Sequence, residues 1–299
     1  MQQQFNEKNA NIQIFVDDKL YPRSEAKISV FDSSVQGGDA VWEGLRVYNR
    51  KIFCLNEHLE RMHASAKTLV FAAIPSKKFI KDAIKQTLIA NDMQTDVHIR
   101  LTLTRGEKIT SGMDPRLNQK KCCLIVLAEF KPPVYDNSKG IKLITSHIRR
   151  NSPMHLDSKI HHNNLINNIL AKIEANYCNA DDAIMLDNLG FVAETNACNI
   201  FMVKKNILYT PHADACLPGI TRATVIEIAH ELNIIVTEKN ISISEFYSAD
   251  EVFTTGTMGE LTPVMEIDGR IIENKFSEKI RDKIYAAFKK LTETKGEEI

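Results

Sequence analysis

Two loop segments of the chain place glycine and hydroxyl side chains next to an expected helix or strand. Residues 217–222 (LPGITR) precede the amphipathic run ATVIEIAHEL, so free backbone N–H groups and the positive end of a helix dipole should meet at Ile220 and Thr221. Residues 254–260 (TTGTMGE) follow the strand-like EVF and add hydroxyls and glycine backbone. Both segments predict an anion site, with a threonine-capped loop and a threonine-rich strand end as the plain structural alternatives.

Two charged residues outside these loops are candidates for chemistry. Glu194 lies in VAETNACNIF, between an apolar strand and a hairpin, where burial is expected. A bare buried carboxylate is costly, so Glu194 needs a cationic partner, either in a structural ion pair or at a functional group. Lys159 lies in HLDSKIHHNN, where a loop gives way to a helix. By its own surroundings it is one solvated lysine among many.

The composition indicates a soluble globular protein that handles small molecules. Apolar residues make up 43% and charged residues 25% of the 299 residues, and Lys+Arg and Asp+Glu are both 38 without a long basic block, so no nucleic-acid partner is expected. The first residues lack a basic segment followed by an apolar one, and no run of about eighteen apolar residues occurs, so we expect a cytoplasmic protein with no membrane partner. The six cysteines form no CxxC pair and the nine histidines no HExxH motif, which predicts reduced thiols and no metal site.

The pattern of apolar residues predicts an α+β chain of two domains. We expect a smaller α/β domain over 1–132, a linker over 133–140 in the segment KPPVYDNSKG, and a larger α+β domain over 141–299. In the smaller domain we expect strands at 12–18, 27–32, 44–48, 51–55, 97–104 and 122–130, a turn at Asn49-Arg50, and helices at 56–71, capped by Asn56, and at 76–91.

The larger domain shows mixed patterning. We expect strands at 141–146, 183–187, 233–237 and 251–256, a hairpin over 199–210, a short hairpin over 265–272 that turns at Asp268-Gly269, helices near 163–178 and from 221, and a closing helix. The last eight residues, TETKGEEI, are interpreted as a charged tail.

Taken in order, these segments resemble the class IV, or fold type IV, pyridoxal-phosphate aminotransferases, the family of branched-chain and D-amino-acid aminotransferases. The resemblance covers nearly the whole chain, and its order and spacing are specific. It is carried by WEGLRVY at 42–48, EHLERM at 57–62, SAK at 65–67, Lys159 ahead of AKIEA at 171–175, ETNACNIF at 194–201, LPGITR at 217–222, TGT at 255–257 and ELTP at 260–263. The resemblance implies a two-domain fold with the cofactor in the interdomain cleft, and a homodimer or higher homo-oligomer.

The resemblance also implies how pyridoxal 5'-phosphate would be held. Lys159 would be joined covalently to the cofactor aldehyde and, once freed by substrate, would shuttle the α-proton. Glu194 would face the pyridine nitrogen and keep the ring protonated, so that the ring can accept electrons. The phosphate would be held by four residues: Arg61, Ile220, Thr221 and Thr257.

The substrate side departs from the branched-chain pattern. The resemblance implies that Trp42, Arg100 and the backbone of Met258 and Gly259 bind substrate. The family's tyrosine about five residues after the lysine is absent from residues 160–164 (IHHNN), so Asn164 would serve as the donor to the cofactor ring oxygen.

A second departure is Gly37, which occupies the place of an aromatic residue expected about five positions before the tryptophan. The implied activity is ping-pong transamination between an amino acid, first choice a branched-chain L-amino acid, and a 2-oxo acid such as 2-oxoglutarate. Alternatives within the family are a D-amino-acid or (R)-amine transaminase and aminodeoxychorismate lyase. Outside enzymes, the alternative is a cofactor carrier without turnover.

Overall fold

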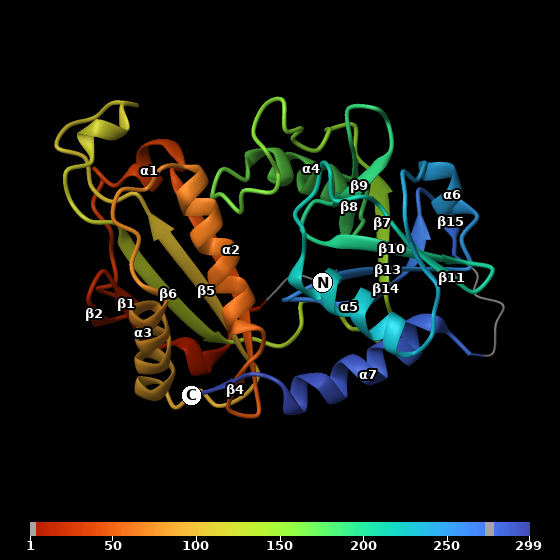
Figure 1. Ribbon diagram of the computed structural model, residues 1–299, viewed down its shortest axis with the longest axis horizontal. Coiled ribbons are helices and arrows are strands. Elements are labelled where there is room, and N and C mark those ends of the chain that lie inside the picture. Colours follow the sequence, from red (N-terminus) through yellow and green to blue (C-terminus); the bar gives the residue numbers. More distant parts are fainter. Residues whose placement is uncertain (1–3, 273–277) are drawn as a thin grey trace. The chain divides into compact units, whose positions relative to one another are not determined.

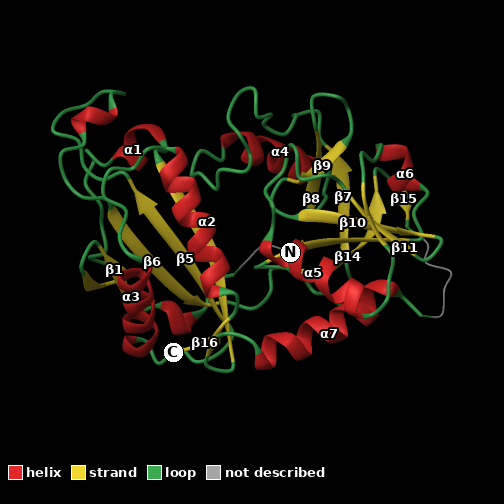
Figure 2. Cartoon of the chain, viewed as in Figure 1, coloured by secondary structure: helices red, strands yellow, loops and turns green. Residues whose placement is uncertain are grey.

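The computed structural model describes residues 4–272 and 278–299 and shows two compact units (Figures 1 and 2). The first unit contains the described residues 4–132, together with Ile160–Asn164 and Thr292–Ile299. The second contains Pro133–Lys159 and Leu165–Leu291. The division expected from the sequence also ends the first domain at 132 but assigns 160–164 and 292–299 to the second; in the structure these two segments pack with the first unit.

The first unit is built on an antiparallel sheet with the strand order β16-β4-β3-β5-β6-β1-β2 in the described part of the chain. Its strands are β1 (Gln13–Val16), β2 (Lys19–Pro22), β3 (Ala40–Tyr48), β4 (Lys51–Ile52), β5 (Val97–Thr104), β6 (Cys123–Phe130) and β16 (Glu297–Glu298). Asn49 and Arg50 join β3 to β4 with φ of 46° and 65°, the backbone that a two-residue hairpin turn requires. The predicted turn is therefore confirmed.

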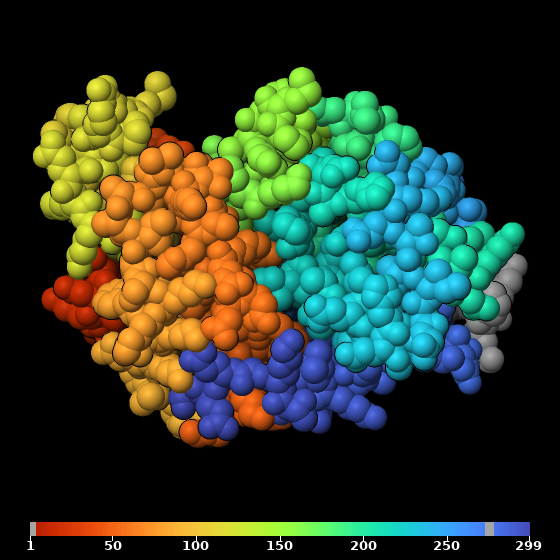
Figure 3. All heavy atoms as spheres, in the orientation of Figure 1, coloured from red at the N-terminus to blue at the C-terminus, as the bar shows by residue number. Residues whose placement is uncertain are grey.

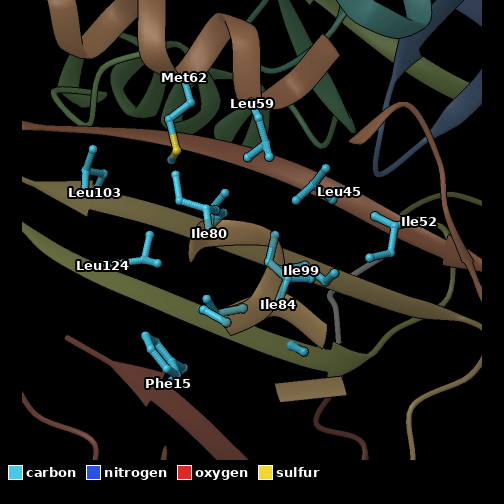
Figure 4. Close-up of a cluster of buried hydrophobic side chains, with 14 of the residues drawn as sticks. Phe15, Leu45, Ile52, Leu59, Met62, Ile80, Ile84, Ile99, Leu103 and Leu124 are labelled. Carbon is cyan, nitrogen blue, oxygen red and sulfur yellow. The ribbon is translucent and has the colours of Figure 1, made fainter. Parts of the chain in front are cut away.

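Two helices, α2 (Leu55–Thr68) and α3 (Lys77–Ala90), pack on this sheet, and the shorter α1 (Ser33–Gly37) and the 3-10 turns η1 (Glu7–Asn9) and η2 (Pro115–Leu117) lie in its connections. Side chains alternate along a strand, so every second residue of β3 and β5 enters the core beneath α2. Figure 4 shows Leu59 and Met62 of α2 directed at the strands. In Figure 3 the orange and golden atoms of the segments that contain α2 and α3 form part of the face turned to the viewer. Each fully buried side chain of this kind stabilises the fold by about 1.5–3 kcal/mol.

Three expectations for this unit were wrong. Residues 27–32 form no strand, and Val30 within them is 73% exposed. Helix α2 begins at Leu55 after Cys54, which adopts a left-handed backbone and makes no side-chain cap, so Asn56 is not the cap. The supposed tail contains β16, which pairs with β4.

The second unit contains a mixed sheet with the strand order β12-β11-β10-β13-β14-β7-β8-β9, and β15 pairs with β14 beside that path. Its strands are β7 (Ile141–Thr145), β8 (Asp182–Leu186), β9 (Val192–Thr195), β10 (Asn199–Lys204), β11 (Ile207–Thr210), β12 (Val236–Glu238), β13 (Glu251–Gly256), β14 (Glu260–Ile267) and β15 (Arg270–Ile271). The pairs β11–β12, β14–β7 and β7–β8 are parallel, and the others are antiparallel.

Four helices accompany the strands of this sheet in the described residues. Helix α4 (Ile166–Tyr177) packs on β8, and α5 (Ile220–Glu231) packs on β12 and β13. The short α6 (Ile243–Tyr247) precedes β13, and α7 (Ile280–Thr294) is the closing helix expected from the sequence. Across the described residues, no helix is both long and apolar enough to cross a membrane.

Candidate active site

Glu194 is a buried carboxylate on β9, where it lies opposite Met185 of β8 and is 5% exposed. Its Oε1 accepts a hydrogen bond from Nε of Arg150 at 2.6 Å, and its Oε2 accepts one from Nδ2 of Asn199 at 3.1 Å. Burial of a charge is tolerated when the charge is paired and hydrogen-bonded. Arg150 is therefore the cationic partner that the sequence required without identifying.

Asn199 connects Glu194 to the loop ahead of α5. Its Nδ2 also donates to the carbonyl of Leu217 at 2.9 Å. The loop runs so close to Asn199 that a Cβ on Gly219 would lie 2.0 Å from Oδ1 of Asn199. Only glycine fits there without displacement, and the approach fixes the entry to α5 relative to the carboxylate.

The first turn of α5 offers amide donors. Its N-cap is Gly219, which has no side chain to satisfy the terminal N–H groups, and these include the amides of Ile220 and Thr221. Helix α5 packs on β13, where the buried Thr255 has an Oγ1 without a hydrogen-bond partner among the residues that the structure describes. Thr257 follows β13 directly, so the two predicted anion loops extend from packed neighbours. Amides, hydroxyls and a helix dipole together suit a phosphate.

Lys159 lies beside the same loop. Its Nζ donates to the backbone carbonyl of Asp214 at 3.1 Å. The pKa of the nearby Cys216 thiol depends on the charges around it. Burial, and then the charge of Glu194, raise this pKa far above the usual range. The charges of Arg222, Arg150 and Lys159 lower it and so oppose that rise. Lysine, carboxylate and helix terminus are therefore parts of one neighbourhood in the second unit.

Arg61 in the first unit is bound by a buried carboxylate. Its Nε and Nη2 lie 2.8 and 2.7 Å from the two oxygens of Glu43, which is fully buried. Nδ1 of His58 lies 2.6 Å and Nδ1 of His161 lies 3.1 Å from the same carboxylate. Burial alone would raise the pKa of Glu43, but His161, Arg61 and His58 hold it well below its usual range.

Trp42 of β3 and Arg100 of β5 lie together on the face of the first unit's sheet opposite to that of Glu43. The guanidinium carbon of Arg100 is 3.5 Å from the Trp42 ring centre, and Nη2 of Arg100 donates to Oδ1 of Asn163 at 2.8 Å. Burial lowers the pKa of Arg100 to about 10. Arg100 is thus a stacked and largely buried cation. Asn164 lies next to Gly38: a Cβ built on Gly38 would be 3.7 Å from Cα and Cβ of Asn164. The first unit therefore brings Trp42 and Arg100 into contact, while Met258 and Gly259 lie in the second unit.

Sequence reasoning missed four residues that hold these groups: Glu43, Arg150, His161 and Asn199. Glu43 could have been recognised from the sequence, because it alternates with the apolar Val41 and Leu45 on one side of a strand-like segment, where an acid is unusual. Asn199 lay within the motif ETNACNIF. Nothing in the sequence distinguishes Arg150 from the adjacent Arg149 as the partner of Glu194. The described cysteines are free, and the described residues contain no cluster of three or more potential metal ligands.

Known proteins resemble the chain over nearly its full length. A model of the family described as amino-transferase class IV matches residues 40–267. The chain belongs to the class IV amino-transferase family. The resemblance named from the sequence motifs is therefore confirmed.

Two relatives of this class IV chain are named as branched-chain-amino-acid aminotransferases or as proteins like them. Branched-chain-amino-acid aminotransferase-like protein 2 of Arabidopsis thaliana is 61% identical over 97% of this chain, and the match covers 52% of that protein, so the chain spans about half the length of this relative. A putative branched-chain-amino-acid aminotransferase of Methanocaldococcus jannaschii is 39% identical over 93% of this chain and 96% of its own length.

A solved structure supports the fold class. A branched-chain amino acid aminotransferase from T.th., complexed with N-(5'-phosphopyridoxyl)-L-glutamate, matches with a TM-score of 0.87 and 32% identity, covering 95% of this chain and 94% of that chain. The predicted α+β, fold type IV architecture is confirmed by this match. In the second unit, the class IV chain presents groups that fit a phosphorylated pyridine: the Lys159 amine, the Glu194 carboxylate as an acceptor, and the uncapped helix amides and Thr255 hydroxyl as donors.

Proposed function

We propose that the chain is a pyridoxal-phosphate aminotransferase that moves an amino group from an amino acid, first choice a branched-chain L-amino acid, to a 2-oxo acid such as 2-oxoglutarate by a ping-pong reaction. The observation that carries the proposal is the link from Glu194 through Asn199 to Leu217, because it sets a buried carboxylate at a fixed place relative to the amides of α5. A pyridine nitrogen and a phosphate on one ring need those two partners at once.

The residues would divide the work as follows. The bound cofactor would supply an electron-accepting ring. Lys159 would take the α-proton from the substrate carbon and return it at the aldehyde-derived carbon, as general base and then general acid. Glu194 would hold a proton at the ring nitrogen. The amides of Ile220 and Thr221 would bind the phosphate.

The remaining assignments are proposals of the same kind. Arg61 and Thr257 would bind phosphate, and Asn164 would donate to the ring oxygen. The close Arg100–Trp42 pair and the backbone of Met258 and Gly259 would recognise substrate.

A homodimer is also proposed. Helix α4 leaves an apolar stripe exposed at helical spacing, in which Ile166, Ile169, Leu170, Ile173 and Tyr177 are each at least 43% exposed. In a symmetric dimer, the same stripe of a second copy of the chain would cover these side chains. Light scattering of the wild type and of Ile173→Glu tests this: the wild type should have the mass of a dimer and the variant should dissociate, whereas a monomeric wild type would contradict it.

The activity is tested with purified protein, leucine and 2-oxoglutarate, with glutamate as the measured product. Borohydride should fix the cofactor to Lys159, as located by peptide mass mapping. Lys159→Ala should lower the rate by at least about a thousandfold, whereas Lys139→Ala, at a 79% exposed side chain, should leave it unchanged. A colourless protein in which borohydride fixes no cofactor would refute the proposal.

The amino donor is decided by a panel. L-amino acids, D-amino acids and (R)-amines are compared at equal concentration, with the 2-oxo product measured. Turnover of only D-amino acids or (R)-amines would replace the branched-chain assignment, and release of pyruvate from aminodeoxychorismate would indicate the lyase. Bound cofactor without any turnover would indicate a carrier.

A further inference from the structure

Arg150 is buried beside Glu194 and is hydrogen-bonded through both its backbone and its side chain. Its backbone N–H donates to the carbonyl of Leu186 at the end of β8, at 2.8 Å. Its side chain is 7% exposed and that of Glu194 is 6% exposed, with Nε and Oε1 separated by 2.6 Å. The adjacent Arg149 is exposed, and its Nη1 donates to the backbone carbonyls of Ser146 and His147 instead. Two neighbouring arginines therefore have opposite environments.

A buried carboxylate stays ionised when nearby cations and hydrogen-bond donors compensate for the lost hydration, and a cation in direct contact contributes most. The thiols of Cys198 and Cys216 also lie close enough to Glu194 to interact with its charge. Burial, together with that charge, raises the pKa of both thiols far above the usual range, so both remain neutral. Neither thiol can supply a positive charge. Arg150 supplies one in direct hydrogen-bond contact, and a charge-assisted bond of this length is among the stronger ones in proteins.

We propose that Arg150 is a positioning residue that keeps Glu194 ionised and correctly oriented, so that the ring nitrogen of the bound cofactor retains its proton. The inference rests on the proposed function and deepens it. Arg150 acts through Glu194, and its removal would transfer the proton from the ring nitrogen to the carboxylate. The cofactor would then bind less tightly.

The experiment is a titration of cofactor-free full-length chain with pyridoxal phosphate, followed by absorbance. Arg150→Met should raise the Kd at least about tenfold, the effect expected for loss of one charge-assisted hydrogen bond. Arg150→Lys keeps a cation and should restore most of the affinity. Arg149→Met is the matched control and should bind like the wild type. Circular dichroism checks folding, and Arg150→Gln, which retains a polar side chain, replaces the methionine variant if that variant does not fold.

A second background separates this role from general damage to the fold. With Glu194→Gln already present, Arg150→Met should change the Kd by less than about threefold, because there is no carboxylate left to hold. Equal losses with and without Glu194, or Arg150→Met binding as tightly as Arg149→Met, would overturn the inference alone. A wild-type chain that binds no pyridoxal phosphate would instead overturn the proposed function.

Discussion

Gly219 and Asn199 approach each other so closely that a Cβ on Gly219 would lie 2.0 Å from Oδ1 of Asn199. Gly219→Ala must therefore displace Asn199 or the loop, and overpacking of this kind costs about 1–3 kcal/mol. We expect that loss in the free energy of unfolding by urea, together with weaker binding of pyridoxal phosphate.

The matched control for that substitution is Gly37→Ala. Nothing lies within 4 Å of a Cβ at Gly37, which is in α1, so the variant should be neutral or slightly more stable. If Gly219→Ala were as stable as Gly37→Ala, the close approach would have no energetic consequence.

Asn199→Ala removes the donor to both Glu194 and the Leu217 carbonyl. Leaving buried acceptors unsatisfied costs about 1–3 kcal/mol each, so we expect a lower unfolding midpoint in urea. Asn188→Ala, at an exposed turn, should leave the midpoint unchanged. Identical midpoints for the two variants would contradict a structural role for the link.

Glu43→Gln removes the charge that Arg61, His58 and His161 share. Breaking a buried ion pair from one side costs about 3–5 kcal/mol, and this loss should appear in the free energy of unfolding. Glu60→Gln is the control, because the Glu60–Lys77 pair is exposed and should contribute less than about 1 kcal/mol. A Glu43→Gln variant as stable as Glu60→Gln would show that the cluster adds nothing to folding.

His98 predicts how stability depends on pH. Burial, and then the charges of Lys131, Arg46 and Arg100, lower the pKa of His98 to about 3 from 6.5. Between these values the unfolded chain binds a proton that the folded chain does not, so stability falls as the pH falls, by up to about 1.4 kcal/mol per pH unit from this group.

The measurement is urea unfolding at pH values of about 6.5, 5.5 and 4.5, which lie in the upper part of the window between the two pKa values. His98→Gln should flatten the slope by about that amount, while His155→Gln, at an exposed position, should follow the wild type. Parallel slopes for all three proteins would show that His98 does not titrate as described.

Local signals predicted much of the fold. Helix α3 spans Lys77–Ala90 against the predicted 76–91, and β5 spans the predicted 97–104. Residues 27–32 alternate like a strand, but in the structure they make only the isolated bridge of Asp32 with Glu107, because pairing is decided by distant segments. For the same reason β16 could not be foreseen, because its partner β4 lies about 245 residues away.

The candidate site shows the same division. The sequence required a cation for Glu194, because burial of an acid has a general cost, and the structure contains one. The identity of that cation depends on the backbone path that brings Arg150 to the end of β8, next to Glu194. No local sequence pattern predicts this contact. Roles that need substrate or cofactor in place, such as those of Arg61 and Asn164, remain predictions.

The chain passes between its two units at residues 132–133, 159–160, 164–165 and 291–292. The first unit thus includes the pairing of β16 with β4, although β4 is made early in synthesis and β16 at residues 297–298. During translation the first sheet cannot be completed until residue 298 has left the ribosome, after the whole of the second unit, which ends at Leu291, has emerged. A nascent chain stopped before residue 292 should expose the unpaired edge of β4 and need protection from aggregation.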